Sequence, residues 1–168
     1  MDKKVKSKVN QKKYLTFFVD DEQYGIDISK IREIIAPMHI AHVPKTPEFL
    51  KGVMNLRGSV VPIVDIRLKF GMDEREMDID TAIIIYETDD ASIGFIVDKV
   101  EDVLMFDEEH ISQAPHFGSN IDTSFIESVA EVDGDVIMLL NLEKIFEAEE
   151  LLDISQLESN EKHIQEEI

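Results

Sequence analysis

The sequence predicts a mainly β protein with a few short helices. Short segments rich in Val, Ile and Phe recur along the chain, and this composition is typical of strands. Turn-forming residues separate them, and 43% apolar with 32% charged residues fits a globular domain. The predicted strands are Tyr14–Val19, Gly25–Ile28, Val53–Leu56, Val60–Ile66, Ala82–Tyr86, Ile93–Val97, Val100–Phe106, Ile126–Val132 and Val136–Leu142.

Turns and caps set the limits of these elements. Asp20-Asp21, Arg57-Gly58, Asp89-Asp90 and Asp133-Gly134 each lie between two predicted strands. The Asp133-Gly134 pair is a strong hairpin signal, because glycine tolerates the positive φ of a tight turn. Two helices are predicted from apolar spacing and a capping residue: Ser29–Ile35, with Ser29 as the N-cap, and Leu142–Leu152, capped by Asn141.

The chain also repeats itself. Residues 20–34 align with residues 89–103, and residues 58–66 align with residues 134–142, in the same order. The spacing between the two blocks is longer in the second copy, which predicts an insertion around Glu109 to Phe117. We therefore expect two similar β-units, 14–80 and 81–146, each closed into a small barrel that leaves no open edge.

Charge distinguishes the ends from the body. Residues 1–13 form a basic arm with a net charge of +5, and residues 147–168 form the end of the last helix and an acidic tail with a net charge of −7. The folded body is expected at 14–152, together one domain. With −19 overall, the chain would repel nucleic acid.

Several kinds of chemistry are disfavoured. The chain has no Cys, no apolar run approaching the roughly twenty residues of a membrane helix, and no glycine-rich phosphate loop or nucleophile elbow. We expect a soluble, cytoplasmic chain with no cofactor, no metal and no insertion into a membrane. The alternative is a small hydrolase or metal enzyme built from the carboxylates and His39/His42, but prolines flank that pair and argue against a helix that would align both imidazoles.

Two features favour a binding module. Arg57, in the Asn55–Gly58 segment, could form a fixed pair with a nearby acid and shape a surface. Phe117 lies between Pro115 and Gly118 in the predicted insertion, where it could tuck into the core or serve as a contact anchor.

Seven segments carry a family resemblance: 24–28, 30–34, 51–58 and 60–67 in the first half, and 94–98, 100–104 and 137–145 in the second. Together these motifs resemble the CheW family of chemotaxis coupling proteins. The resemblance covers about residues 14 to 150.

This resemblance implies an adaptor rather than an enzyme, built from two SH3-like five-stranded barrels. Its partners would be the cytoplasmic tip of methyl-accepting chemoreceptors and the regulatory domain of the CheA histidine kinase, in arrays on the inner face of the membrane. A detached kinase regulatory domain, or an adaptor that lacks a receiver domain, is a related alternative.

The family's functional positions fall on particular residues here. Asn55 and Arg57 match its Asn-Leu-Arg-Gly motif, and Glu33 matches the acid that pairs with this Arg. The resemblance implies an apolar groove that involves Ile31, Ile34, Val100 and Val103, and a loop for a second kinase contact at His116 and Phe117. Some relatives carry an acid at the position of His116.

Overall fold

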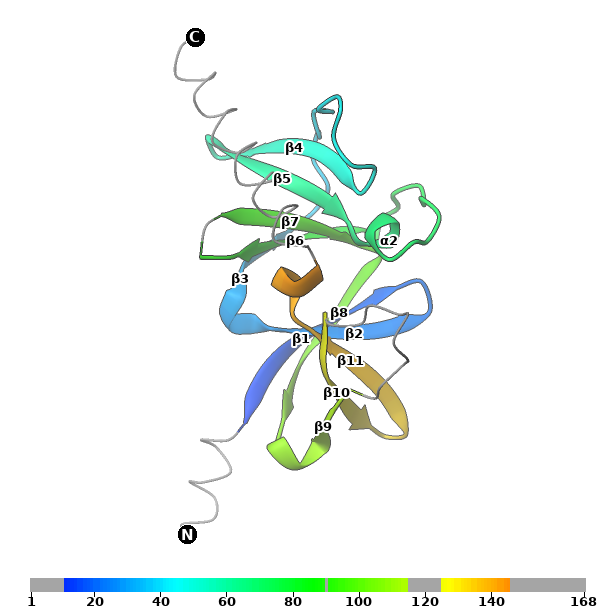
Figure 1. Ribbon diagram of the computed structural model, residues 1–168. Helices are drawn as coiled ribbons and strands as arrows, with labels where there is room; N and C mark the ends of the chain where they lie inside the picture. Colours follow the sequence, from blue (N-terminus) through cyan, green and yellow to red (C-terminus); the bar gives the residue numbers. More distant parts are fainter. Residues whose placement is uncertain (1–10, 90, 115–124, 146–168) are drawn as a thin grey trace. The chain divides into compact units, whose positions relative to one another are not determined.

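The computed structural model describes residues 11–89, 91–114 and 125–145, and it confirms a mainly β chain with two sheets (Figure 1). Its elements are β1 (Lys12–Val19), β2 (Glu22–Asp27), η1 (Ile28–Lys30), β3 (Ile31–Ile35), β4 (Leu50–Leu56), β5 (Ser59–Asp65), α2 (Ile66–Lys69), β6 (Ala82–Glu87), β7 (Ser92–Val97), β8 (Lys99–Phe106), η2 (Glu108–His110), β9 (Ile111–Gln113), β10 (Ile126–Val132), β11 (Asp135–Leu140) and η3 (Leu142–Ile145). The elements labelled η are short 3₁₀ helices.

The two sheets share one strand order. The first sheet runs β8-β1-β2-β11-β10-β9, and the second runs β3-β6-β7-β5-β4. When the repeat is followed along the chain, β1 to β5 correspond to β6, β7, β8, β10 and β11. The central parallel pair is then the same in both sheets, because β2 pairs with β11 and β7 pairs with β5.

The compact units are not the two halves of the sequence. Among the described residues, those up to Ser29 belong with those between Val100 and Ile145, whereas those between Lys30 and Lys99 form the second unit. The expected division at 14–80 and 81–146 is therefore corrected. Sequence similarity shows which segments are copies, but the first hairpin of each copy pairs with the second hairpin of the other, and only the hydrogen-bond partners reveal this exchange.

The strand number also differs between the units. The second sheet has the expected five strands, while the first has a sixth, β9, which pairs antiparallel with β10 through Ser112 and Val129. Strand β9 lies inside the insertion that the longer spacing of the second copy predicts. An insertion of this kind can add an edge strand without altering the shared order.

The helix predictions are mostly wrong. Ser29–Ile35 is not a helix, because only Ile28–Lys30 forms a 3₁₀ turn and Ile31–Ile35 is strand β3. The spacing of its isoleucines fits a helix, but β-branched side chains also favour strands, and pairing with β6 decides the outcome. Asn141 does cap a helical turn by accepting a hydrogen bond from the Glu143 amide at 3.1 Å, but the described part of that element is the 3₁₀ helix Leu142–Ile145. The α-helix at Ile66–Lys69 was not predicted.

Each unit has its own apolar cluster. The second unit buries a set of aliphatic side chains that includes Met54, Ile63 and Ile83, and the first unit buries Tyr14 and Phe106 among others. Glycines bring the parallel strands close together. A Cβ at Gly94 would lie 2.6 Å from Cδ1 of Ile63, and one at Gly25 would lie 2.9 Å from Cδ2 of Leu139.

Candidate functional site

The turn between β4 and β5 presents the Asn55–Gly58 motif. Arg57 and Gly58 have φ values of 51° and 88°, so both turn residues are in the left-handed region typical of a tight hairpin. The Asn55 side chain accepts a hydrogen bond from the Gly58 amide at 2.9 Å, which holds the turn from within. The sequence prediction of a turn here is confirmed, and the Asp133-Gly134 turn between β10 and β11 repeats it with φ values of 50° and 86°.

The guanidinium of Arg57 forms an ion pair with the carboxylate of Glu33 on β3. This is the pair that the resemblance implies. The Glu33 side chain is 23% exposed and that of Arg57 is 64% exposed, so the acid is partly buried and the base faces solvent. An exposed ion pair of this kind contributes less than about 1 kcal/mol to stability, so its importance is positional.

Strand β3 carries the two isoleucines of the predicted apolar groove. Its pairing with β6 shifts register between Ile31 and Glu33, which marks a β-bulge. Ile35 packs against the core cluster of the second unit, whereas Ile34 is 42% exposed. Ile31 is half-buried. Ile34 is therefore an exposed apolar side chain of the second unit, on the same strand as Glu33 and next to it in the sequence.

Strand β8 carries the other two groove residues and belongs to the sheet of the first unit. Val103 is 49% exposed, and Val100 is half-buried. Because β8 corresponds to β3 in the repeat, the same strand of each copy supplies the predicted contact residues. The hydroxyl of the buried Thr16 on β1 holds β8 in place: it donates to the carbonyl oxygen of Asp102 at 2.9 Å and accepts from the Asp102 amide at 3.2 Å.

The structure does not describe the loop that is predicted to make a second kinase contact. His116 and Phe117 lie outside the described residues. The role that the resemblance implies for them stays a prediction.

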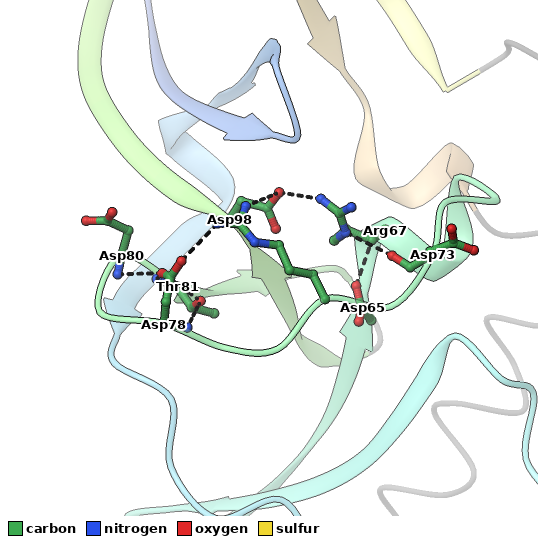
Figure 2. Close-up of polar contacts among 8 residues, drawn as sticks. Asp65, Arg67, Asp73, Asp78, Asp80, Thr81 and Asp98 are labelled. Carbon is green, nitrogen blue, oxygen red and sulfur yellow. Dashed lines mark hydrogen bonds and ion pairs between the residues drawn. The ribbon is translucent and has the colours of Figure 1, made fainter.

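A buried polar cluster in the second unit was missed by the sequence reasoning (Figure 2). Arg67 donates to Asp98 with Nη1 and Oδ2 2.6 Å apart, and both side chains are nearly buried. Asp65 accepts a hydrogen bond from the Arg67 amide and caps α2, and burial is the main cause that raises its pKa above the ordinary value. Asp65 ends β5 and Asp98 follows β7, and the ends of parallel neighbours meet at one edge. The β5–β7 pairing joins two copies of the repeat, however, and no sequence pattern signals it.

Among the described residues, the two histidines of the enzyme alternative are not part of a metal-binding cluster. His39 and His42 lie in the segment between β3 and β4, and the described residues contain no group of three or more His, Cys, Asp or Glu side chains placed to hold a metal ion. In the same described ranges, no helix is long and apolar enough to cross a bilayer.

Comparison with known proteins identifies the family. The model of the CheW-like domain matches residues 13–150. The chain belongs to the CheW-like family. It is 36% identical over 138 residues to the chemotaxis protein CheW of Klebsiella aerogenes, a match that covers 82% of this chain and 83% of the relative. Its identity to the chemotaxis protein CheW of Rhizobium meliloti is 32% over 136 residues, covering 81% and 88%.

A solved CheW structure has the same fold. The crystal structure of the scaffolding protein TtCheW from Thermoanaerobacter tengcongensis superposes with a TM-score of 0.75 at 37% identity, covering 83% of this chain and 94% of the other. The CheW resemblance predicted from the motifs is confirmed. The prediction that the chain is not an enzyme agrees with the names of these relatives, which are those of chemotaxis and scaffolding proteins.

Proposed function

We propose that this chain is a chemotaxis adaptor that couples methyl-accepting chemoreceptors to the CheA histidine kinase by binding both. The observation that carries the proposal is the CheW-like match across residues 13–150, which takes in both units. An adaptor of this kind transmits a signal through differential contact with the states of its partners, and it needs no catalytic group.

The partner surfaces we assign are preformed. Glu33, Asn55 and Arg57 form one polar feature in the second unit, fixed by the ion pair and by the Asn55–Gly58 hydrogen bond. Ile31 and Ile34 on β3 supply apolar area there, and Val100 and Val103 on β8 supply it in the first unit. Apolar anchors beside ordered polar groups are typical of protein interfaces.

We assign the kinase contact to the regulatory domain of CheA, and the receptor contact to the cytoplasmic hairpin tip. His116 and Phe117 are proposed for a second kinase contact on the strength of the family motif alone. These contacts would place the chain at receptor arrays on the cytoplasmic face of the membrane. With a charge of −17 over residues 14–146, we expect both associations to depend on salt concentration.

Calorimetric titration of the full chain tests the proposal. A purified receptor cytoplasmic fragment and purified CheA are titrated separately, each at low and high salt. We expect saturable binding to both. If neither titration shows a heat of binding, the adaptor role is overturned.

Arg57→Ala with Arg32→Ala as a matched control tests the residue assignment within the same titrations. Arg32 also lies in the second unit, where its guanidinium is 3.8 Å from a carboxylate oxygen of Glu87. Weaker partner binding by the Arg57 variant alone supports the assignment, and equal binding by both variants contradicts it.

A further inference from the structure

A trough runs along the outer edge of β8 in the first unit. Two adjoining hollows of about 300 and 220 Å³ form it, and they share the side chains of Leu104, Val132 and Asp133. Three successive side chains of β8, at positions 104–106, line the larger hollow. Because successive side chains of a strand point to opposite faces, a hollow that touches all three lies along the edge of the strand. In the described part of the chain, β8 is also the last strand of its sheet, with β1 as its neighbour (Figure 1).

The trough combines apolar surface with acidic walls. Leu104 and Val132 pack against the core cluster of this unit, to which the buried Phe106 belongs. Among the described residues, the lining includes His110 but no Lys or Arg. Its acidic side chains are Glu101, Asp102, Glu131, Asp133 and Asp135. A segment that fits this trough must therefore carry both apolar and positively charged side chains.

The N-terminal arm of the same chain has this composition. Residues 1–11 contain four lysines and a single acid, Asp2. Residues 4–9 read Lys-Val-Lys-Ser-Lys-Val, an alternation with a period of two. In an extended segment this pattern places the valines on one side and the lysines on the other. The valines can then contact the apolar surface of the trough while the lysines face its carboxylates.

The arm is attached close to the trough. It joins β1 at Lys12, and the ring of Tyr14 near that end lies 5.8 Å from the ring of Phe106 at the end of β8. To pass over β8 to its outer edge, the arm must cross two strand spacings, about 10 Å, which three extended residues cover. Residues 3–8 then span roughly 20 Å, most of the length of an eight-residue strand such as β8. The arm is therefore long enough to fill the trough of its own chain.

We propose that residues 3–9 dock as an extended segment in the acidic trough between β8 and the end of β10 in the same chain. The docked arm covers the outer edge of β8, which is the kind of exposed edge on which other chains pair and aggregate. Because the arm is tethered, the docking is intramolecular and does not depend on protein concentration. It is separate from the proposed coupling of receptors to CheA.

Disulfide closure within the full-length chain tests this docking, since the chain has no native Cys. Ser7→Cys in the arm is combined with Met105→Cys in the trough, where Met105 is 51% exposed. The rate at which a mild oxidant closes the disulfide is measured on the monomer in dilute solution. Glu131→Lys reverses a charge of the trough and should slow closure several-fold. Glu127→Lys makes the same change at an exposed position of β10 outside the described lining, and it should leave the rate unchanged.

Charge reversal in the arm provides the reciprocal test. Lys6→Glu together with Lys8→Glu should slow closure several-fold when the trough is native. The same pair should restore part of the lost rate when it is added to Glu131→Lys. Absence of this recovery would contradict charge pairing between the arm and the trough.

Two further results would overturn the proposal. One is an equal closure rate in the Glu131→Lys and Glu127→Lys proteins, and the other is a disulfide that joins two chains instead of closing within one. If the two rates are equal but Glu131→Lys weakens the calorimetric binding of purified CheA, the trough holds a segment of the kinase and the arm is not its occupant. Because closure is measured without CheA or receptors, a failure of the docking leaves the adaptor role to its own titrations.

Discussion

Arg57 in the β4–β5 turn forms an ion pair with Glu33 on β3, although β3 and β4 lie at opposite ends of the strand order of their sheet. A flat sheet would keep these two strands four positions apart. The pair therefore shows that the sheet curls until its edges approach, in agreement with the SH3-like barrel that the resemblance implies. It joins sheet closure and the candidate binding surface in one contact.

Removal of the Arg57 guanidinium should impair function more than folding. We expect Arg57→Ala to lower receptor-dependent kinase activity while the free energy of unfolding falls by less than about 1 kcal/mol, because the pair is largely exposed. Kinase assays and urea denaturation of the same preparation measure both quantities. A loss of activity that only tracks a large loss of stability would mean that Arg57 has a purely structural role.

Thr16 should be needed to hold β8 on the first sheet. Thr16→Val keeps the shape of the side chain but leaves the backbone amide and carbonyl of Asp102 without the hydroxyl, which should cost about 1–3 kcal/mol of unfolding free energy. Thr16→Ser retains the hydroxyl and should recover most of that loss. Chemical denaturation of the three proteins decides the matter, and equal stability of the Val and Ser variants would refute this role.

Gly94 should resist substitution because of space. Its backbone approaches Ile63 on the parallel strand β5, so the Cβ of Gly94→Ala would overpack the core and destabilise by about 1–3 kcal/mol. Ile63→Val removes the Cδ1 atom that the new Cβ would meet at 2.6 Å. The double variant should then be less destabilised than the sum of the two single changes. Strict additivity in thermal or urea unfolding would exclude the clash as the cause.

The raised pKa of Asp65 predicts that the free energy of unfolding depends on pH. Burial raises its pKa in the folded protein above the 3.8 of an ordinary Asp, so the folded state holds the proton more tightly than the unfolded state does. Its contribution to stability is complete below about pH 3.8 and is lost as the pH rises through the raised pKa. Asp65→Asn keeps a side-chain acceptor for the Arg67 amide and has no charge to bury. Its stability relative to the wild type should therefore increase from acid to neutral pH, whereas a constant difference across that range would contradict the assignment.

The local structure was predictable where one side chain or one turn decides it. Segments rich in Val, Ile and Phe identified most strands, and the Arg57-Gly58 and Asp133-Gly134 turns followed from their turn-forming residues, with glycine tolerant of positive φ. The pattern failed at Ile31–Ile35, where isoleucine spacing fits both a helix and a bulged strand. Pairing with β6, which is remote in sequence, selected the strand.

The long-range arrangement was only partly predictable. The repeat revealed two copies, but β2 pairs with β11 and β7 with β5 across the copies, and nothing within one copy specifies this exchange. For the same reason, Arg67 and Asp98 gave no sign of pairing, because they lie in different copies of the repeat. The ion pair between Glu33 and Arg57 could be predicted only from the family motif.

The most direct test of the adaptor role is the rate of CheA autophosphorylation in the presence of receptors, measured with and without the full chain. We predict that receptors change the kinase rate strongly only when the chain is present, and that Arg57→Ala weakens this effect. A kinase rate that responds to receptors equally well without the chain would contradict it.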